Sequence, residues 1–570
     1  MTFSRLLLAA FLSAAPAAAP APTTSLKVDQ VGYPLDAPKV ALVVADTGPS
    51  RFAVRHAATG AVAFEGQLGA PVADADSGDR VQAADFSKLQ QPGTYYVDVP
   101  GVGRSWDFAI GPRPYQRALY LAMRSFYGQR CGTAVDLGPE FPGYTYAACH
   151  LVGAFHPSSG KTGPRASTRG WHDAGDYGRY VVNSGITTGT LLWAFEMFGP
   201  TLRELRLNIP ESGNGTPDLL DEVRWNLEWM LSMQDDDGGV WQKQTSETFC
   251  GFVMPEKDTM PSVVVGTGAE PFKSSCATAD LAAVMAIAGR VYRPFDAGFA
   301  DKALAAARKA WGWIEKNPDV LFTNPKGVNT GEYGDRNCGD ERLWAAAELW
   351  RSTGESGYEH TFLDQHERFL ERLSASNPEG WGQVAPMGLW TYVLGTGKDA
   401  AAVTSIRDAT LRAADQILER SRANGYRVSL TPREYVWGSN GVAANYGVGL
   451  LVADVFRRDR RYVDAALDNL HYLLGRNTFS VSWVTRVGAN PFRHPHHRPS
   501  GADANPEPWP GLLSVGPNRS RQDPAMEKLP AGLPPARMYL DEEASYATNE
   551  IAINWNAPLV FVLAGVQARP

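Results

Sequence analysis

Two aspartates in a short segment rich in glycine and aromatic residues carry the clearest chemical signal in this sequence. Asp173 and Asp176 stand three residues apart with Gly175 between them, which allows a tight backbone turn. We expect a helix to start at Asp176 or just after it, with both carboxylates near its N-terminal end, where the helix dipole stabilises their ionised form. An ionised carboxylate there could act as a general base. The alternative is an aspartate that only caps the helix.

Glu550, near the C-terminus, offers the complementary acid. It lies in a predicted apolar helix over residues 546–567, with Ile551, Ile553 and Trp555 as neighbours. Apolar surroundings raise the pKa of a carboxyl group, and a protonated glutamate can serve as a general acid. The alternative is a glutamate that only interacts with the dipole at the start of the helix.

A basic loop punctuated by proline lies between these two sites in the sequence. It runs from Gly488 to Arg498 and includes His494, His496 and His497. The imidazoles and the guanidinium group of Arg498 suit hydroxyl-rich ligands, which they could hold by hydrogen bonds. Three histidines within four positions are also compatible with a metal cluster.

The elements that must position these residues change character after Pro112. Before it, short alternating segments between Gly, Pro and Asp turns predict a small β-sandwich: residues 39–45, 51–56, 61–66, 80–86, 94–99 and 105–110. After it, a period of 3.6 residues predicts twelve helices: residues 114–128, 176–198, 217–234, 276–291, 299–316, 340–353, 358–375, 381–395, 399–424, 441–457, 460–475 and 546–567. Twelve helices favour six hairpins closed into a double ring, an (α/α)₆ barrel. Unusually long loops at 129–175, 235–275 and 476–545 are expected to be functional.

An N-terminal targeting segment is expected at residues 1–22. Arg5 precedes an apolar run over residues 6–15, and small residues follow, which is the layout of a secretory signal peptide. The run is too short to span a membrane, and no later window is apolar for long enough. We therefore expect a secreted or periplasmic protein, with a β-sandwich domain at 23–111 and a helical domain at 112–570.

Length and charge narrow the class of protein further. The chain has 570 residues, of which 44% are hydrophobic and 20% charged, so it is long enough for two or more domains with a large core. Its net charge of -7 comes without a basic patch, which argues against nucleic acid as a partner. We expect a monomer that binds neither nucleic acid nor membranes.

Three separated motifs, in this order, resemble glycoside hydrolase family 9. They are Asp173-Ala-Gly-Asp176, then Gly488-x-Asn490 leading to Pro495-His496-x-Arg498, then Tyr539-x-Asp541 leading through Tyr546 and Glu550 to Asn556-Ala557. The opening Val28-Asp29-Gln30-Val31-Gly32-Tyr33-Pro34 resembles the start of the module that precedes the catalytic domain in some of these cellulases. The resemblance implies an N-terminal immunoglobulin-like β-sandwich followed by an all-α (α/α)₆ barrel catalytic domain. It also implies inverting hydrolysis of β-1,4-glucans such as cellulose, the reaction of an endoglucanase.

The same resemblance implies catalytic roles. Asp176 would be the general base, Asp173 its partner in holding the water, and Glu550 the general acid. An inverting enzyme holds a water between base and sugar, so its two carboxyl groups should stand roughly 6.5 to 9.5 Å apart.

Further residues would bind the substrate in the same cleft. By resemblance, His496 and Arg498 would bind sugar hydroxyls, and Tyr546 would line the cleft. Because aromatic faces stack on glucose rings, Trp437 and Tyr446 are our candidates for stacking. The alternative for each ring is packing in the core.

Four residues near the first motif suggest a structural zinc site. Cys131, Cys149, His150 and His172 form a Cys₂His₂ set, which suits tetrahedral zinc, although their spacing is unlike that of a zinc finger. The family resemblance implies the same ligands, and a zinc ion there would brace the loop that starts at Asp173. A disulfide between Cys131 and Cys149 is the alternative. Since the chain has five cysteines, at least one thiol is free, metal-bound or paired between chains.

A calcium site is implied by resemblance in the segment from Thr330 to Glu341. The segment does not follow the EF-hand pattern, but it offers hard oxygen ligands on Asp335, Asn337, Asp340 and Glu341. The alternative is an acidic N-terminal cap for the next helix.

Two other functions remain open. One is an exo-acting glycosidase that releases glucose, cellobiose or glucosamine from chain ends, which depends on whether loops block the cleft. The other is a carbohydrate-binding protein with a decayed active site. The sequence favours the enzyme because both acids and the basic loop are present.

Overall fold

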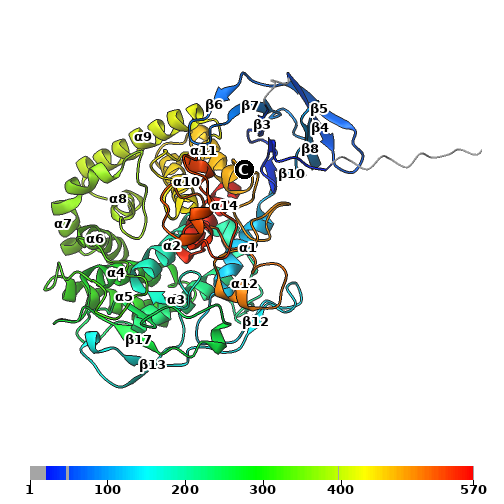
Figure 1. Cartoon of the computed structure of the whole chain (residues 1–570). Helices are drawn as coiled ribbons and strands as arrows, with labels where there is room; N and C mark the ends of the chain where they lie inside the picture. The colour runs from blue at the N-terminus through cyan, green and yellow to red at the C-terminus, as the bar shows by residue number, and fades with distance from the viewer. Residues whose placement is uncertain (1–20, 46–49, 396, 569–570) are drawn as a thin grey trace, which may run out of the picture.

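The computed structural model describes residues 21–45, 50–395 and 397–568. The expected signal peptide lies outside the described residues, apart from its last two positions. A β-sandwich, blue in Figure 1, stands beside a larger helical body whose C-terminal helix, in red, runs near its middle. None of the described helices has the length and apolar character needed to cross a membrane.

The N-terminal sandwich consists of two sheets. One has the strand order β1-β3-β7-β6, and the other has the order β2-β10-β8-β4-β5 with β9 paired to β8. The strands are β1 (Leu26–Lys27), β2 (Gly32–Pro34), β3 (Val40–Val44), β4 (Arg51–His56), β5 (Val62–Gln67), β6 (Val72–Ala73), β7 (Arg80–Asp85), β8 (Gly93–Val99), β9 (Gly103–Arg104) and β10 (Phe108–Gly111). The six predicted strands are confirmed, except that the last begins at Phe108 rather than at residue 105.

Aromatic side chains fill the space between the two sheets. The ring of Tyr33 meets the rings of Phe86 and Phe108 edge-on, at centroid distances of 5.3 and 5.2 Å. Alternation along each strand directs such side chains inward. The sandwich therefore has its own hydrophobic core, separate from that of the helical body.

The helical body is a double ring of helix pairs. The inner helices are α2 (Val181–Arg203), α4 (Ser275–Val291), α6 (Gly339–Thr353), α8 (Ala385–Leu394), α10 (Ser439–Phe456) and α14 (Ile553–Gln567). The outer helices are α1 (Gln116–Gly128), α3 (Asp218–Ser232), α5 (Ala297–Ile314), α7 (Ser356–Gln365), α9 (Ala400–Ala423) and α11 (Arg460–Leu473). Helix α14 contacts α2 and α10, α4 contacts α2 and α6, and α6 contacts α8, which gives the inner ring of an (α/α)₆ barrel.

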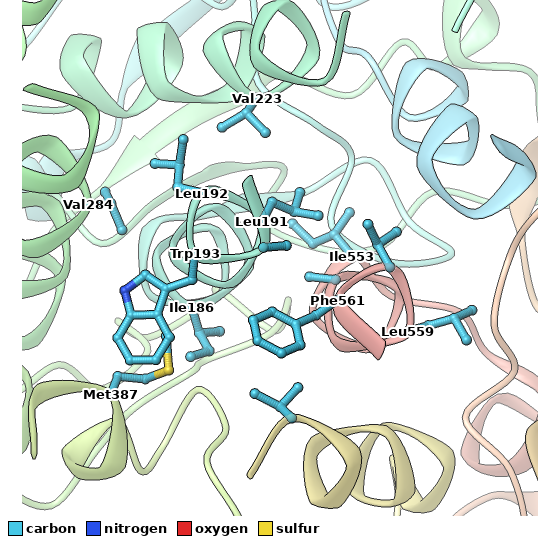
Figure 2. Close-up of a cluster of buried hydrophobic side chains, with 14 of the residues drawn as sticks. Ile186, Leu191, Leu192, Trp193, Val223, Val284, Met387, Ile553, Leu559 and Phe561 are labelled. Carbon is cyan, nitrogen blue, oxygen red and sulfur yellow. The ribbon is translucent and has the colours of Figure 1, made fainter. Parts of the chain in front are cut away.

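The inner helices are apolar around most of their circumference, and this places them in the core. Figure 2 shows Leu191 of α2 near Phe561 of the neighbouring helix α14, and Trp193 of α2 beside Met387 of α8. The outer helices α5 and α9 are amphipathic and bury one face only, whereas α11 is buried along most of its length. Strand β10 ends at Gly111 and α1 begins at Gln116, and we keep the division at residues 111 and 112 as a proposal.

Two predicted helices are wrong in part, one in where it starts and one in its continuity, and both errors fall at the motifs. Helix α2 begins at Val181, five residues after Asp176, because Arg179 and Tyr180 form strand β15 and pair with β16. The predicted helix over 546–567 is broken into α13 (Tyr546–Asn549) and α14, with Glu550 in extended backbone between them. In both places, pairing with a distant segment replaces the local helical hydrogen bonds.

The long loops form a further sheet that the sequence did not predict. Its strand order is β14-β13-β17-β16-β15, and it lies across the predicted loops 129–175 and 235–275. The strands are β13 (Val152–Phe155), β14 (Pro164–Ala166), β15 (Arg179–Tyr180), β16 (Lys243–Thr245) and β17 (Ser262–Val265), while β11 (Val135–Asp136) pairs with β12 (Thr145–Tyr146). The predicted helix 358–375 also ends early, at Gln365, and continues as a 3₁₀ helix over His366–Arg372.

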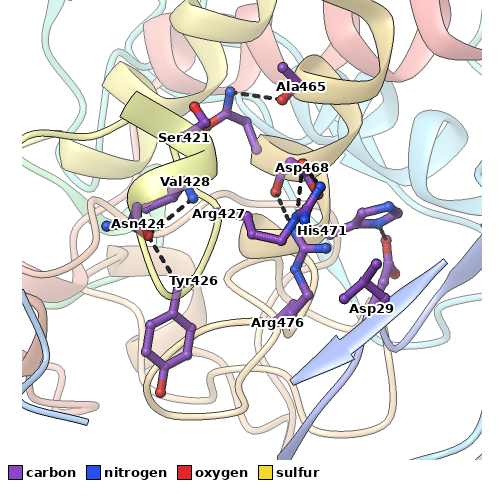
Figure 3. Close-up of polar contacts among 12 residues, drawn as sticks. Asp29, Ser421, Asn424, Tyr426, Arg427, Val428, Ala465, Asp468, His471 and Arg476 are labelled. Carbon is purple, nitrogen blue, oxygen red and sulfur yellow. Dashed lines mark hydrogen bonds and ion pairs between the residues drawn. The ribbon is translucent and has the colours of Figure 1, made fainter. Parts of the chain in front are cut away.

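The sandwich joins the barrel through buried polar contacts (Figure 3). Asp29 Oδ1 accepts the backbone N–H groups of Val31 and Gly32, at 2.8 and 3.1 Å. Asp29 Oδ2 accepts Tyr115 Oη–H at 3.2 Å and His471 Nδ1–H at 2.8 Å, both from the helical body. Burial lowers the pKa of His471, so its neutral imidazole donates to the carboxylate.

Asp29→Ala should weaken the whole protein, because it leaves buried donors on both sides of the joint without a partner. We expect the free energy of unfolding to fall by on the order of 3 kcal/mol, measured by thermal and urea denaturation. Asp36→Ala is the control, since the Asp36–Arg460 ion pair lies at the same joint with both side chains more than half exposed. Equal unfolding curves for the two variants would contradict this role of Asp29.

Candidate active site

A cleft in the barrel collects most of the residues that the sequence singled out. Its cavity volume is about 770 Å³, which lies within the range of pockets that bind small ligands. Predicted residues that line it are Asp173, Asp176, Trp437, His496, Arg498, Tyr546 and Glu550. Segments at residues 173–176, 437, 496–498 and 546–550, which are far apart in the sequence, therefore meet in one place.

The turn between the two aspartates packs directly on the basic loop. A Cβ atom at Gly175 would lie 1.9 Å from the carbonyl oxygen of His496, so no side chain fits there. The carbonyl of Gly175 accepts the backbone N–H of Arg498 at 3.1 Å and its Nη1–H at 2.8 Å. Glycine in the Asp-Ala-Gly-Asp motif is thus required by close approach of a second backbone.

Both carboxylate oxygens of Asp173 accept hydrogen bonds. Oδ1 accepts Asn183 Nδ2–H at 2.7 Å, and Oδ2 accepts Tyr333 Oη–H at 2.6 Å. Burial, and next the neighbouring charge of Asp176, raise the pKa of Asp173 to about 7. The backbone carbonyl of Asp173 accepts Ile553 N–H at 2.9 Å, which ties this residue to the start of α14.

Asp176 is bonded on one side only. Its Oδ2 accepts Gly178 N–H at 3.0 Å and Tyr180 Oη–H at 3.2 Å. The hydrogen bonds to its carboxylate from the described residues all fall on Oδ2, so Oδ1 is left to accept a bond from a molecule in the cleft. This distinguishes Asp176 from Asp173.

Glu550 lines the same cleft from a short extended segment between α13 and α14. It forms a β-bridge with His496, and its carbonyl accepts Val515 N–H at 2.7 Å. Its Oε2 accepts Trp437 Nε1–H at 3.2 Å. Burial, and next the charges of Asp176 and Asp173, raise the pKa of Glu550 well above its usual range, so the carboxyl group holds a proton near neutral pH.

The basic loop presents one imidazole and one guanidinium group to the cleft. His496 Nδ1–H donates to the carbonyl of Glu543 at 2.7 Å, and burial lowers the pKa of His496, which leaves Nε2 as an acceptor. Arg498 lies beside it and also donates to the carbonyl of Cys250 at 3.0 and 3.1 Å.

A metal cluster on the three histidines is wrong, because their side chains diverge. His497 Nε2 contacts Gln129 Oε1 at 3.0 Å, whereas His494 is exposed and faces Asp541. Neither ring turns toward His496, whose Nδ1 is bonded to the Glu543 carbonyl.

The two aromatic candidates for sugar stacking differ in position. Trp437 is 38% exposed and lies 5.6 Å from the ring of Tyr546, as a surface for a sugar ring requires. Tyr446 is only 1% exposed, and its hydroxyl donates to Glu434, away from the cleft. We therefore correct the interpretation of Tyr446 to core packing, which its place in the apolar helix α10 could have indicated.

Several cleft residues were missed by the sequence interpretation. Tyr333 holds Asp173, and Asn183 does so from the first turn of α2. Other lining residues are Tyr180, Phe249, Glu332, Trp381, Asn554 and Trp555. An aromatic residue in a long glycine-rich loop was the available signal for Tyr333, since such loops are commonly functional.

The four predicted zinc ligands lie together behind the aspartate loop. The ligand atoms of Cys131, Cys149, His150 and His172 all lie within 4.8 Å of one another, and both cysteines are free thiols. His172 Nε2 lies 3.7 Å from Cys149 Sγ. His150 Nε2 contacts Asp258 Oδ2 at 3.2 Å, while its buried Nδ1 has no hydrogen-bond partner. Two thiols and two imidazoles, one backed by a carboxylate, fit a tetrahedral metal site.

The four predicted calcium ligands do not form such a group. Asp335 Oδ1 accepts Arg336 N–H at 2.5 Å, and Asp340 Oδ2 accepts Val384 N–H at 2.9 Å. Asn337 Oδ1 accepts Gly339 N–H at 3.1 Å, so this side chain and Asp335 serve the turn itself. Glu341 is fully buried beside Asp340, and burial, followed by the charges of Asp340, Asp280 and Asp335, raises its pKa well above the usual range. A calcium ion held by these residues stays a prediction.

A disulfide occupies the same region. Cys276 at the start of α4 is bonded to Cys338, the residue before α6, across 62 positions of sequence. Cys131, Cys149 and Cys250 are the remaining cysteines, and all three are free thiols. The disulfide fixes the end of the loop that carries Tyr333.

Comparisons with known proteins agree with this architecture. The family model "Glycosyl hydrolase family 9" matches residues 115–563, and "Cellulase N-terminal ig-like domain" matches residues 21–104. Endoglucanase D of Acetivibrio thermocellus is 40% identical over 497 residues, which cover 86% of this chain and 76% of that protein. A cellodextrinase of Butyrivibrio fibrisolvens is 34% identical over 557 residues, which cover 95% of this chain and 99% of that protein.

A solved structure with the same fold is that of a zinc-binding triple mutant of a family 9 endoglucanase. It superimposes with a TM-score of 0.87 at 35% sequence identity, covering 94% of this chain and 99% of that chain. The likeness therefore extends over both the sandwich and the barrel.

Proposed function

Because this chain belongs to glycosyl hydrolase family 9, we propose that it is an inverting endo-β-1,4-glucanase acting on cellulose or a related β-glucan. The observation that carries the proposal is the pair of unlike acids in one cleft. Glu550 holds a proton near neutral pH, and Asp176, in the same cleft, offers an unbonded carboxylate oxygen. An acid and a base on the two sides of a glycosidic bond are what inversion requires.

The proposed reaction uses these groups in one displacement. Asp176 Oδ1 takes a proton from a water molecule, which attacks the anomeric carbon from the face opposite the leaving group. Glu550 donates its proton to the glycosidic oxygen as the bond breaks. Asp173 helps to hold the water, and its own orientation is fixed by Tyr333 and Asn183. Preformed hydrogen bonds of this kind lower the barrier because no group has to reorganise during the reaction.

Sugar binding is proposed for the other cleft residues. Trp437 and Tyr546 offer adjacent ring faces beside Glu550, and Phe249 is exposed on the cleft wall. Arg498 donates and His496 Nε2 accepts, which suits hydroxyl groups that can do both.

Exo action on short chains is the second candidate. The observation in its favour is the likeness to a cellodextrinase along 99% of that protein's length. The ratio of viscosity loss to new reducing ends on a soluble β-glucan separates the two, since endo cleavage lowers viscosity early and exo cleavage does not.

We also propose that Cys131, Cys149, His150 and His172 bind a structural zinc ion. Zinc on two thiolates and two imidazoles supplies cross-linking of the chain and no chemistry in the cleft. The proposal is supported by the convergence of the four side chains. Export is a further proposal, supported by the disulfide between Cys276 and Cys338, which is typical of oxidising compartments.

Asp176→Asn and Glu550→Gln should each lower the rate of β-glucan hydrolysis by on the order of 10² to 10⁴, because each removes a proton acceptor or donor. Reducing-end release from purified protein measures the rate, and circular dichroism checks the fold. Glu507→Gln is the control, since Glu507 pairs with Arg493 and is not among the residues that line the cleft. Wild-type rates in either active-site variant would contradict the assignment.

Trp437→Phe should move the alkaline limb of the kcat/KM profile to higher pH. The indole N–H stabilises the carboxylate of Glu550 and so lowers its pKa; without this donor the pKa rises further. Activity that needs protonated Glu550 is lost as pH rises through that pKa, so the loss should occur later. Trp381→Phe is the control. An unmoved limb, or one moved to lower pH, would argue against Glu550 as the acid.

Elemental analysis should find about one zinc per chain, lost on chelation or at acid pH, because thiolates and neutral imidazoles bind the metal. Cys149→Ser should lose the zinc and melt at a lower temperature, whereas Cys250→Ser should retain the metal, since Cys250 lies outside the set. Mass spectrometry that finds a disulfide between Cys131 and Cys149 in native protein without zinc would remove the proposal.

A further inference from the structure

Lys243 is a buried lysine beneath the cleft for which the mechanism above has no role. It is 0% exposed and belongs to strand β16. Its Nζ donates to Asn324 Oδ1 at 2.7 Å, to the carbonyl of Gly331 at 2.7 Å, and to Thr330 at 3.2 and 3.3 Å. An ammonium group has three N–H donors, so these acceptors satisfy it completely.

The acceptors belong to the loop that forms one wall of the cleft. Residues 329–333 of this loop line the cleft, and the last of them is Tyr333. Tyr333 has a positive φ of 45°, a strained conformation for a non-glycine residue that persists only when its surroundings impose it. Gln242, next to Lys243, donates to the Tyr333 carbonyl at 3.0 Å. Strand β16 and the residue before it therefore hold the loop that aims the Tyr333 hydroxyl at Asp173.

A second path leads from Lys243 to the other aspartate. In the pairing of β15 with β16, Lys243 stands opposite Tyr180, and its Nζ lies 5.6 Å from the centre of that ring. Tyr180 Oη–H donates to Asp176 Oδ2 at 3.2 Å. A Cβ atom at Gly331 would lie 3.2 Å from the same ring, so the loop that Lys243 holds also packs against Tyr180.

We propose that Lys243 is a positioning residue that sets the tyrosine hydrogen bonds to both Asp173 and Asp176. It touches neither aspartate itself, and it acts through the backbone of the 329–333 loop and through the ring of Tyr180. This inference rests on the proposed function of the two aspartates, because their exact orientation matters only if they hold and activate the water.

Lys243→Met tests the proposal, since methionine keeps most of the length and apolar surface but has neither donors nor charge. We expect kcat on β-glucan to fall about 10- to 100-fold with KM changed less than about threefold, because misplacement by about 1 Å can cost on this scale. Lys273→Met is the matched control: Lys273 is also buried and pairs with Asp235, but it is not among the residues that hold the loop. The control should keep the wild-type kcat.

Two readouts separate positioning from a general loss of structure. Hydrogen exchange should accelerate in residues 324–333 of Lys243→Met and not in Lys273→Met. The double variant Lys243→Met with Tyr333→Phe should lose less activity than the two single losses combined, since both variants break the path through Tyr333 and only Lys243→Met also affects Tyr180. If Lys243→Met does not fold, Asn324→Ala replaces it, because this change removes one acceptor and leaves the lysine in place.

The proposal is overturned if the variant keeps wild-type kcat, if exchange in the 324–333 loop is unchanged, or if its effect adds in full to that of Tyr333→Phe. A wild-type enzyme without activity on any β-glucan would instead count against the proposed function. In that case hydrogen exchange still decides whether Lys243 holds the loop.

Discussion

The site depends on one contact between two backbones that are more than 300 residues apart. The turn at Gly175 lies against the backbone of His496, and Arg498 donates twice to the Gly175 carbonyl. Since no side chain fits at Gly175, the contact fixes the distance between the aspartate turn and the basic loop. Glu550 is bridged to His496 from the other side, so the same contact also places the acid relative to the base.

The close packing of Asp173, Asp176 and Glu550 determines which carboxyl group of the cleft holds a proton. Three carboxyl groups lie in one partly buried space, where they cannot all be ionised at low cost. Hydrogen bonds divide the roles among them: Asp173 is held on both oxygens, Asp176 on one, and Glu550 by a single indole N–H. Burial and the neighbouring charges of Asp176 and Asp173 therefore favour the proton on Glu550.

Much of the fold was predictable from local pattern. Apolar residues recur with a period of two in the sandwich and of 3.6 in the barrel, because a strand and a helix each bury one face. The change of period therefore marks the boundary between the two domains. The errors fall where tertiary pairing overrides the local helical preference. Asp176 precedes a strand rather than a helix, and Glu550 interrupts a predicted helix. Motif order led to the correct family, and the apolar pattern of α10 could have placed Tyr446 in the core, but no pattern in the sequence reveals that Tyr333 reaches Asp173. That bond depends on a contact between distant segments.

The most direct measurement is proton NMR of the first sugar released from a β-linked cello-oligosaccharide, recorded before mutarotation. If Asp176 activates a water while Glu550 protonates the leaving oxygen, the new reducing end appears as the α-anomer. Initial release of the β-anomer would mean retention through a covalent intermediate, and it would contradict the role of Asp176 as a general base.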